Sequence, residues 1–228
     1  MKRTNLILTA LLLIVVIGCS KLDNYPAPNA GVNGTVIDNT TNAGIQTEAG
    51  SGFQIGLIES GYSSVIPINF YAKADGSFEN TQLFADKYKV IPFNGAFLQS
   101  DTVTVDVKGL TTVNFTVTPF MSVNASTPQL SGKNIIVNYT LSKPSQIGYD
   151  IIDCMTMAAS VPSVCASVND YNVSHSLSGS TYQQIAAMQF SDTLKSMSSG
   201  TYYVRVAGLT NNSQNKYNYS KVYTVTVP

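Results

Sequence analysis

Regular alternation of apolar and polar residues places the strongest limit on what this chain can fold into. Three stretches with a period of two residues gather apolar side chains on one face: Phe53, Ile55 and Leu57; Val103, Val105 and Val107; and Val113, Phe115 and Val117. This period is typical of half-buried strands, because successive side chains of a strand point to opposite faces. Turn-forming residues at 38–44, 74–77 and 108–109 separate the stretches. The pattern predicts an all-β fold of antiparallel sandwich strands.

The alternation stops around Thr118-Pro119-Phe120, and a second series follows. Strands are expected in this series at residues 121–123, 135–139, 147–152, 201–207 and 221–227. Within it, Tyr202, Val204 and Val206 are expected to face inward, and the surrounding segment resembles the penultimate strand of a fibronectin-III or immunoglobulin-like sandwich. We therefore expect two tandem β-sandwich domains, at residues 31–119 and 120–228.

The segment between the strands of the second series is harder to interpret. Residues 153–195 are rich in Ser, Ala and Met, and no strand is assigned there. A short helix of one or two turns is expected within residues 182–190. In the first half of the chain no stretch has a helical pattern.

The first nineteen residues have the features of a bacterial lipoprotein signal. Lys2 and Arg3 form a positively charged start, and the apolar run 6–17 is shorter than the ~20 residues that span a bilayer. Val16-Ile17-Gly18-Cys19 matches the lipobox, which predicts a signal peptide at 1–18 and acylation of Cys19. An ordinary secretory signal followed by a chance cysteine is the alternative.

Residues 19–30 are polar, carry Pro26 and Pro28, and show no periodicity, so they predict an extended tether. The expected location is the outer membrane, with the chain lipid-anchored at the cell surface and the membrane as its first partner. Two or three acyl chains make such an anchor durable, since one chain binds only marginally.

Composition excludes one class of partner. Loss of Lys2 and Arg3 with the signal leaves 11 basic residues beside 13 acidic ones, so no basic field is available to hold nucleic acid. Only 11% of the residues are charged, against ~25% in an average domain, and Ser, Thr and Asn supply the polarity. This balance is typical of an extracytoplasmic β protein, and we expect a monomer.

Two cysteines remain after lipidation of Cys19. Cys154 and Cys165 are close enough in sequence to close a short disulfide loop in an oxidising compartment, and two free, buried thiols are the alternative. A metal site is not expected, because the chain has one histidine and no Cys-x-x-Cys pair. No cofactor is predicted.

Few residues suggest catalysis. His175 is interpreted as a surface-loop residue, and no serine has the glycine elbow of a nucleophile. The acidic residues are scattered, so a glycan hydrolase stays a remote alternative and a non-enzymatic protein is expected. Asp75-Gly76-Ser77 predicts a turn and not a calcium loop, because too few oxygen ligands follow it.

Aromatic residues are the best sequence clue to a ligand, because sugar rings stack on exposed aromatic faces. The chain has no Trp but 13 Tyr, most of which are expected in strands. Six aromatic residues in expected loops are candidate ligand contacts: Tyr62, Phe97, Tyr171, Tyr182, Tyr217 and Tyr219. Thr102 and Thr193 each occur in the short Asp-Thr-aliphatic pattern associated with bacterial O-glycosylation, which is a weak signal.

A further set of segments is distinctive: Cys19 to Ala30, Gly34-Thr35-Val36-Ile37-Asp38, Gln46-Thr47-Glu48, Asp75-Gly76-Ser77-Phe78, Leu83 to Val90 and Gly95-Ala96-Phe97. Together these segments resemble a family of two-domain Bacteroidetes lipoproteins of unknown function, and the resemblance is looser beyond residue 120. It implies a carboxypeptidase regulatory-like, transthyretin-type first domain and an immunoglobulin-like second domain. It carries no catalytic residues.

The resemblance also implies a setting. Family members are commonly encoded beside a TonB-dependent transporter and its lid lipoprotein in starch-utilisation-type uptake systems. We therefore expect a non-enzymatic accessory of polysaccharide uptake that binds an oligo- or polysaccharide. The alternative is a structural subunit that docks on the transporter, which the absence of Trp favours.

Overall fold

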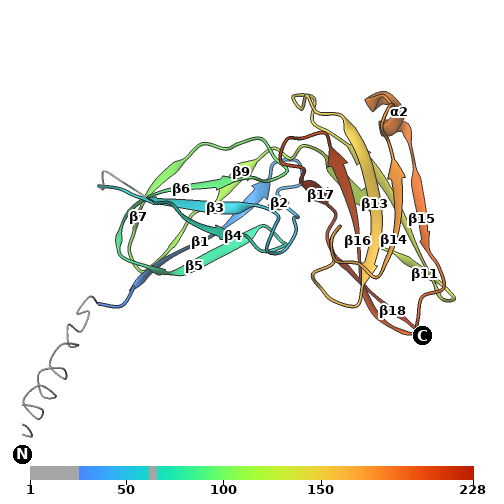
Figure 1. Cartoon of the computed structure of the whole chain (residues 1–228), viewed down its shortest axis with the longest axis horizontal. Coiled ribbons are helices and arrows are strands. Elements are labelled where there is room, and N and C mark those ends of the chain that lie inside the picture. Colours follow the sequence, from blue (N-terminus) through green and yellow to red (C-terminus); the bar gives the residue numbers. More distant parts are fainter. Residues whose placement is uncertain (1–25, 62–65) are drawn as a thin grey trace, which may run out of the picture.

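The computed structural model describes residues 26–61 and 66–228, and it shows two lobes side by side (Figure 1). The predicted signal peptide, Cys19 and Tyr62 lie outside the described residues. We call residues 30–118 the N-terminal lobe and 121–228 the C-terminal lobe, since one hydrophobic core ends at Val117 and the next begins at Met121. The predicted all-β fold class is confirmed. That each lobe is an independently folding domain stays a prediction.

The N-terminal lobe contains two sheets. Its strands are β1 (Ala30–Asp38), β2 (Ala43–Gly44), β3 (Gln54–Glu59), β4 (Ile68–Tyr71), β5 (Ser77–Leu83), β6 (Asp86–Phe93), β7 (Val103–Val107), β8 (Leu110–Thr112) and β9 (Phe115–Val117). One sheet has the order β4-β3-β6-β7, and the other is built around β1, which pairs with β2, β5, β8 and β9. Strands β8 and β9 run parallel to β1, contrary to the expected antiparallel pairing, because the chain crosses from β7 in the first sheet into the second.

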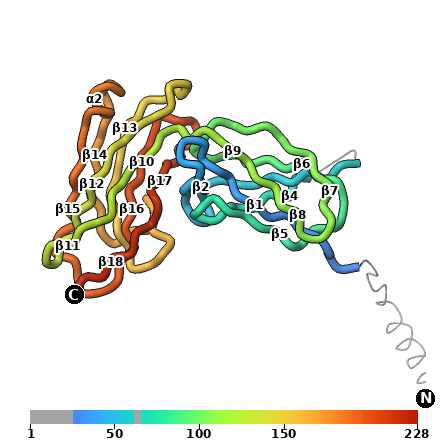
Figure 2. Tube along the Cα trace, turned by 180° about the vertical axis from the view of Figure 1, so that it is seen from behind, coloured from blue at the N-terminus to red at the C-terminus, as the bar shows by residue number. Residues whose placement is uncertain are grey.

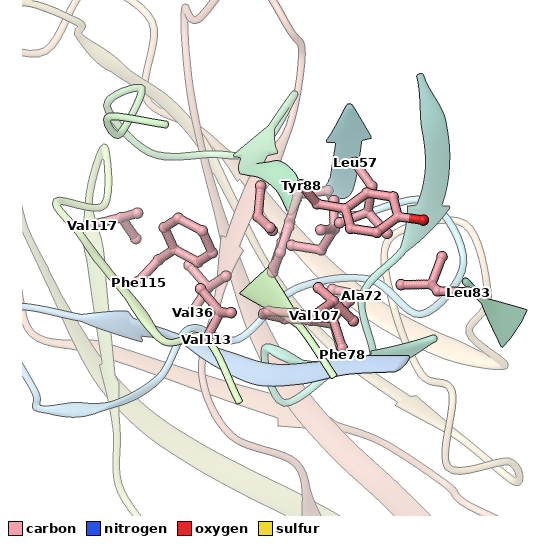
Figure 3. Close-up of a cluster of buried hydrophobic side chains, with 14 of the residues drawn as sticks. Val36, Leu57, Ala72, Phe78, Leu83, Tyr88, Val107, Val113, Phe115 and Val117 are labelled. Carbon is pink, nitrogen blue, oxygen red and sulfur yellow. The ribbon is translucent and has the colours of Figure 1, made fainter. Parts of the chain in front are cut away.

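The core of the N-terminal lobe lies between these two sheets (Figure 3). The expected inward faces are confirmed for Phe53, Ile55 and Leu57 and for Val113, Phe115 and Val117, all of which are buried. The third stretch runs from an exposed Val103 to a fully buried Val107. The predicted turn is also present, because Asp75 Oδ1 accepts bonds from the backbone N–H and hydroxyl of Ser77, and Gly76 has a φ of 81°. The bonds from Ser77 lower the pKa of Asp75.

The C-terminal lobe also contains two sheets. Its elements are β10 (Ser122–Ala125), β11 (Gln129–Ser131), β12 (Asn134–Ser142), β13 (Ile151–Ala159), β14 (Tyr171–Ser176), α2 (Tyr182–Ala187), β15 (Phe190–Leu194), β16 (Gly200–Thr210), β17 (Tyr217–Tyr219) and β18 (Tyr223–Val227). One sheet places β10, β11 and β15 around β12, and the other has the order β14-β13-β16-β17 with β18 also on β16. The expected inward face of Tyr202, Val204 and Val206 is confirmed.

The segment at 153–195 is more regular than the sequence suggested. It holds most of β13 and all of β14 and β15, together with the expected short helix. Helix α2 begins with a capping box, in which the Thr181 hydroxyl accepts from the Gln184 backbone and the Gln184 side chain bonds the Thr181 backbone. Within residues 26–61 and 66–228, no helix has the length and hydropathy of a membrane span.

Cys154 and Cys165 form no disulfide, so the second sequence alternative holds and both thiols are free and buried. The physical reason is the sheet between them. Cys154 packs into the core between the sheets of the C-terminal lobe, whereas Cys165 packs on the opposite face of β13 with Met157 and Ala159.

Candidate functional site

The two lobes meet in a seam, which we define as the surface where residues 47–51 and 94–97 face residues 205 and 216–219 (Figure 2). Arg205 of β16 is its central side chain. Its guanidinium donates to the carbonyl of Thr47 in the N-terminal lobe at 2.9 Å and to the carbonyl of Ser220 at 2.9 Å. The same group lies 4.2 Å from the ring centroid of Tyr219. Burial lowers the pKa of Arg205 to about 10, which leaves it charged at neutral pH.

Three further contacts join the lobes. The Tyr219 hydroxyl donates to the Glu48 carboxylate, and the Asn218 side chain donates to the carbonyl of Ala96 at 2.9 Å. Lys216 reaches across to the carbonyl of Ser51 at 2.6 Å. The seam therefore fixes loops of the C-terminal lobe against the edge of the N-terminal lobe.

Beside Lys216 the seam opens into a groove of about 350 Å³, which we call the seam groove. It is lined by Ser51, Phe53, Gln54, Tyr71 and Asn94 from one lobe and by Ser213, Gln214 and Lys216 from the other. The volume is at the small end of the ~300–1,000 Å³ found for ligand pockets, and it suits one or two sugar-sized groups.

Tyr71 gives this groove an aromatic wall. It ends the edge strand β4, directly opposite Gln54 in the ladder, and its side chain is 50% exposed. The preceding Phe70 packs against the core, so the strand period turns Tyr71 outward. Among the described residues, the Tyr71 hydroxyl and the side-chain amides of Gln54 and Asn94 have no hydrogen-bond partner. These groups are therefore available to a ligand.

Local structure holds the remaining walls in place. Asn94 has a positive φ of 57°, a conformation that Asn tolerates in tight turns. On the other side, the buried Asn212 side chain bonds the backbone of Thr210 and both the N–H and C=O of Lys216. These bonds close the loop that carries Ser213 and Gln214. The groove is thus preformed on both sides of the seam.

A second groove, of about 470 Å³, lies along the seam between Asp38, Gln46, Asn124, Lys221 and Tyr223. Its polar groups are mostly engaged within the protein. The Tyr223 hydroxyl donates to the carbonyl of Ala125 at 2.5 Å, and the Lys221 ammonium lies 5.0 Å from the Tyr223 ring centroid. Asp38 accepts from the N–H and hydroxyl of Thr40. This groove offers a ligand fewer free groups than the seam groove.

A polar cluster lies at the open edge of the C-terminal lobe, where β14 and β15 line a cavity of about 590 Å³. The buried Asp192 carboxylate accepts from the Thr156 hydroxyl at 2.6 Å and the Tyr139 hydroxyl at 3.0 Å, and it lies 2.6 Å from His175 Nε2. His175 lies on strand β14 and not in a surface loop, which corrects the sequence interpretation. Three partners satisfy the carboxylate, as a buried charge requires.

This cluster lacks an activated nucleophile among its described members. Cys154 is its only thiol, and it is fully buried beside the Tyr139 hydroxyl at 3.3 Å. Burial raises the pKa of Cys154 to about 11, so the thiolate form is disfavoured. In the described residues, no group of three His, Cys, Asp or Glu side chains is placed to hold a metal ion.

Two acidic residues, Glu59 of β3 and Asp86 of β6, lie close together in the N-terminal lobe. Burial raises the pKa of Glu59, and the neighbouring Asp86 raises it further. Both residues lie at the end of the N-terminal lobe away from the seam, and neither lines the grooves described above. The arrangement therefore differs from two carboxylates facing each other across a substrate cleft.

The structure does not bring the sequence candidates together. Phe97 and Tyr219, expected to be exposed, are buried: the Phe97 ring meets Phe53 edge-on at 5.4 Å because the segment after β6 folds back onto Pro119. Tyr171 and Tyr217 lie in strands and are half-buried. The Tyr182 hydroxyl bonds the backbone of Lys143. None of these four described tyrosines lines the seam groove.

The two threonine candidates differ in exposure. Thr102 lies on an exposed segment before β7, whereas Thr193 is half-buried in β15 next to the engaged Asp192. Their glycosylation stays a prediction. Sequence reasoning missed Tyr71, although one signal was present: Phe70 and Tyr71 are adjacent, so in any strand that holds them only one ring can face the core.

The fold and the seam groove together define a two-lobed β-sandwich protein with a preformed polar groove between its lobes. Residues 30–118 match the family model described as the N-terminal domain of a protein of unknown function, DUF3823. The match confirms the resemblance of the first half of the chain to a family of unknown function. No curated protein sequence matches the chain.

Solved structures of similar proteins cover both lobes. A DUF3823 family protein from Bacteroides uniformis has a TM-score of 0.76 at 21% identity, over 89% of this chain and 100% of its own. A second B. uniformis protein, named a "putative carbohydrate binding protein", has a TM-score of 0.73 at 23% identity, over 87% and 99%. A DUF3823 family protein from Parabacteroides merdae has a TM-score of 0.72 at 21% identity, over 88% and 100%. At these identities the likeness shows the fold alone.

Proposed function

We propose that this protein is a non-enzymatic, lipid-anchored protein of the outer-membrane cell surface that binds a glycan in the seam groove. The observation that carries the proposal is the half-exposed ring of Tyr71 beside the free amides of Gln54 and Asn94. An aromatic face offers stacking to the C–H face of a sugar ring. Side-chain amides both donate and accept hydrogen bonds, which matches the hydroxyl groups around that ring.

Charge in the groove also fits a neutral or acidic sugar. Lys216 is the charged side chain among the lining residues, and its ammonium is already bonded to the Ser51 carbonyl. The remaining polar lining groups are hydroxyls and amides. Hydroxyl and amide groups of this kind can orient a bound sugar and give it modest affinity, because a few well-positioned polar groups fix a ligand within a partly apolar site.

The location is supported by the lipobox at Val16-Ile17-Gly18-Cys19 and the tether that follows it. The name of the similar B. uniformis protein is consistent with carbohydrate as the ligand class. We place the protein as an accessory of a polysaccharide uptake system. Its anchor would hold the groove at the membrane, where a high effective concentration makes weak contacts useful.

Isothermal titration against starch, xylan, pectin, mannan and mucin glycans tests the proposal. We expect binding to at least one of them, and Tyr71→Ala should weaken that binding at least tenfold, about 1.4 kcal/mol. Tyr71→Phe keeps the ring and should stay within about threefold. Leu130→Ala, an exposed apolar residue of the C-terminal lobe, is the matched control. Absence of binding to every glycan, or equal binding by Tyr71→Ala, would contradict the proposal.

Our proposal for partners is a TonB-dependent transporter and its lid lipoprotein. Co-purification from solubilised outer membranes through a tag at the C-terminus tests it. The C-terminus lies on the C-terminal lobe, away from the start of β1 in the N-terminal lobe, so a tag there leaves the anchor unaltered (Figure 1). Recovery of the protein alone under conditions that keep the transporter and its lid together would contradict this partnership.

A further inference from the structure

Four large apolar side chains are exposed at one end of the N-terminal lobe. Ile66 is 89%, Leu110 56%, Phe84 45% and Ile68 41% exposed. We call this set the apolar tip. Scattered single apolar residues are ordinary on a protein surface, but a group at one end of a lobe points to a contact.

Strand pairing places these four residues at the same end. Ala30, the first residue of β1, is opposite Leu83, which directly precedes Phe84. Gly31 is opposite Leu110, and its N–H bonds the carbonyl of Gly109. In the other sheet, Ile68 begins β4, and Ile66 lies further toward the same end.

This end is also where the tether enters the lobe. Strand β1 begins at the end of the N-terminal lobe opposite the seam (Figure 1). Ten residues, 20–29, separate Cys19 from Ala30. At ~3.3–3.6 Å per residue they reach at most about 35 Å. With the anchor proposed above, the apolar tip faces the membrane surface from a short distance.

Charge at the tip is mixed. Lys87 and Lys108 lie near Glu59, Asp86 and Asp106, and Lys87 pairs with Asp106 at 3.9 Å. The tip therefore has no positive field that would attract anionic headgroups. Its contact with lipid would come from apolar side chains entering the interface between headgroups and acyl chains.

We propose that the apolar tip inserts into the lipid interface and holds the N-terminal lobe against the membrane, with the seam groove facing away from it. This inference rests on the lipid anchor of the proposed function. It adds a second membrane contact, made by the folded lobe itself. Such a contact would restrict how the lobe tumbles on its tether.

Site-directed fluorescence on the full lipidated chain tests the inference. Ala85→Cys puts an exposed thiol beside Phe84, and Ser131→Cys puts one on the C-terminal lobe; Cys154 and Cys165 are buried and should not label in the folded protein. Each variant is labelled with an environment-sensitive dye and reconstituted into phosphatidylcholine vesicles containing brominated acyl chains. We expect strong quenching of the label at position 85 and little at position 131.

A second set of variants tests whether the apolar side chains cause the quenching. Adding Phe84→Ser and Leu110→Ser to the Ala85→Cys chain should reduce quenching at least threefold, with an unchanged thermal midpoint as the folding control. Sedimentation of the vesicles reports the anchor separately. A chain that does not sediment would contradict the anchor and this inference together, whereas sedimentation with an unquenched label at position 85 would contradict this inference alone. If the label at position 85 is shielded from solvent only in native outer-membrane vesicles, the apolar tip contacts a protein of that membrane and not the lipid, which would overturn the inference.

Discussion

Arg205 Nη1 donates to the carbonyl of Thr47, a residue 158 positions away in the sequence and in the other lobe. Arg205 is 1% exposed, and the other acceptors of its bonds are the carbonyls of Ser220 and Val164. A buried charge held only by carbonyls and an aromatic ring is costly unless the geometry is maintained. Arg205 therefore ties the relative placement of the lobes, and with it the seam groove, to the stability of the fold.

Arg205→Ala should destabilise the protein by about 3 kcal/mol, because it leaves three buried carbonyls unpaired and removes the packing on Tyr219. For a chain of this size, that corresponds to a fall of roughly 6–12 °C in the thermal midpoint. Urea unfolding followed by circular dichroism measures the change. Lys195→Ala, an exposed cation of the same lobe, is the control and should change stability by less than about 0.5 kcal/mol. Equal stability of the two variants would show that Arg205 does not secure the seam.

Stability should fall as the pH rises from 9 to 11. Burial raises the pKa of Cys154 from 9.0 to about 11, so above pH 9 the unfolded chain loses this proton while the folded chain keeps it. A group whose folded pKa is raised stabilises the fold fully below its unfolded pKa and progressively less above it. The contribution of this thiol to the free energy of unfolding should fall by at most about 2 kcal/mol. The raised pKa of Tyr139, which faces Cys154 and Asp192, adds a loss of the same sign above pH 10.

Thermal midpoints measured at pH 8, 9, 10 and 10.5 check this dependence. Cys154→Ala should reduce the slope between pH 9 and 10, and the slope that remains should come from buried tyrosines such as Tyr139 and Tyr219, whose pKa values are also raised. Cys165→Ala is the matched control and should keep the slope of the parent protein. An identical slope in all three proteins would rule out Cys154 as the source.

Both thiols should be free in the isolated protein. The sheet that contains β13 separates Cys154 from Cys165, so a bond would require the loop after β13 to leave its place against Met157 and Ala159. Alkylation in denaturant without reductant, followed by peptide mass spectrometry, should find both cysteines modified. Modification that appears only after reduction would mean that a disulfide exists.

Asp192→Asn should destabilise the C-terminal lobe by about 2–3 kcal/mol. The carboxylate accepts hydroxyl bonds from Thr156 and Tyr139 and contacts His175 Nε2, and an amide would turn its own N–H groups toward some of these donors. Asp101→Asn, at an exposed position, is the control and should change stability by less than about 0.5 kcal/mol. The midpoint of urea unfolding is the measurement, and a midpoint equal to that of the control would contradict the structural role of Asp192.

Alternation in the sequence revealed strands such as β3, in which one face is buried. Phe53, Ile55 and Leu57 alternate with more polar or smaller neighbours because only one side of β3 meets the core. Strand β13 was largely missed because both of its faces are covered. Cys154 and Ala158 face one cluster, and Met157 and Ala159 face another, so the period of two disappears.

The seam groove was beyond sequence reasoning for a different reason. Lys216 and Gln214 reach Tyr71 and Gln54 only through the packing of the lobes, over more than a hundred residues of sequence. No local pattern records such a contact. His175 was misread in the same way, since its partner Asp192 comes from the opposite sheet. Tyr71 alone carried a local signal, through its position next to Phe70.

The most direct test of the central claim is a crystal structure of the protein with an oligosaccharide of the glycan retained in the titrations. We predict a sugar ring stacked on Tyr71, with hydroxyl groups bonded to Gln54, Asn94 and Gln214 across the seam. A sugar bound in the groove beside Tyr223, in the cavity beside His175, or elsewhere with the Tyr71 groove empty would contradict the claim.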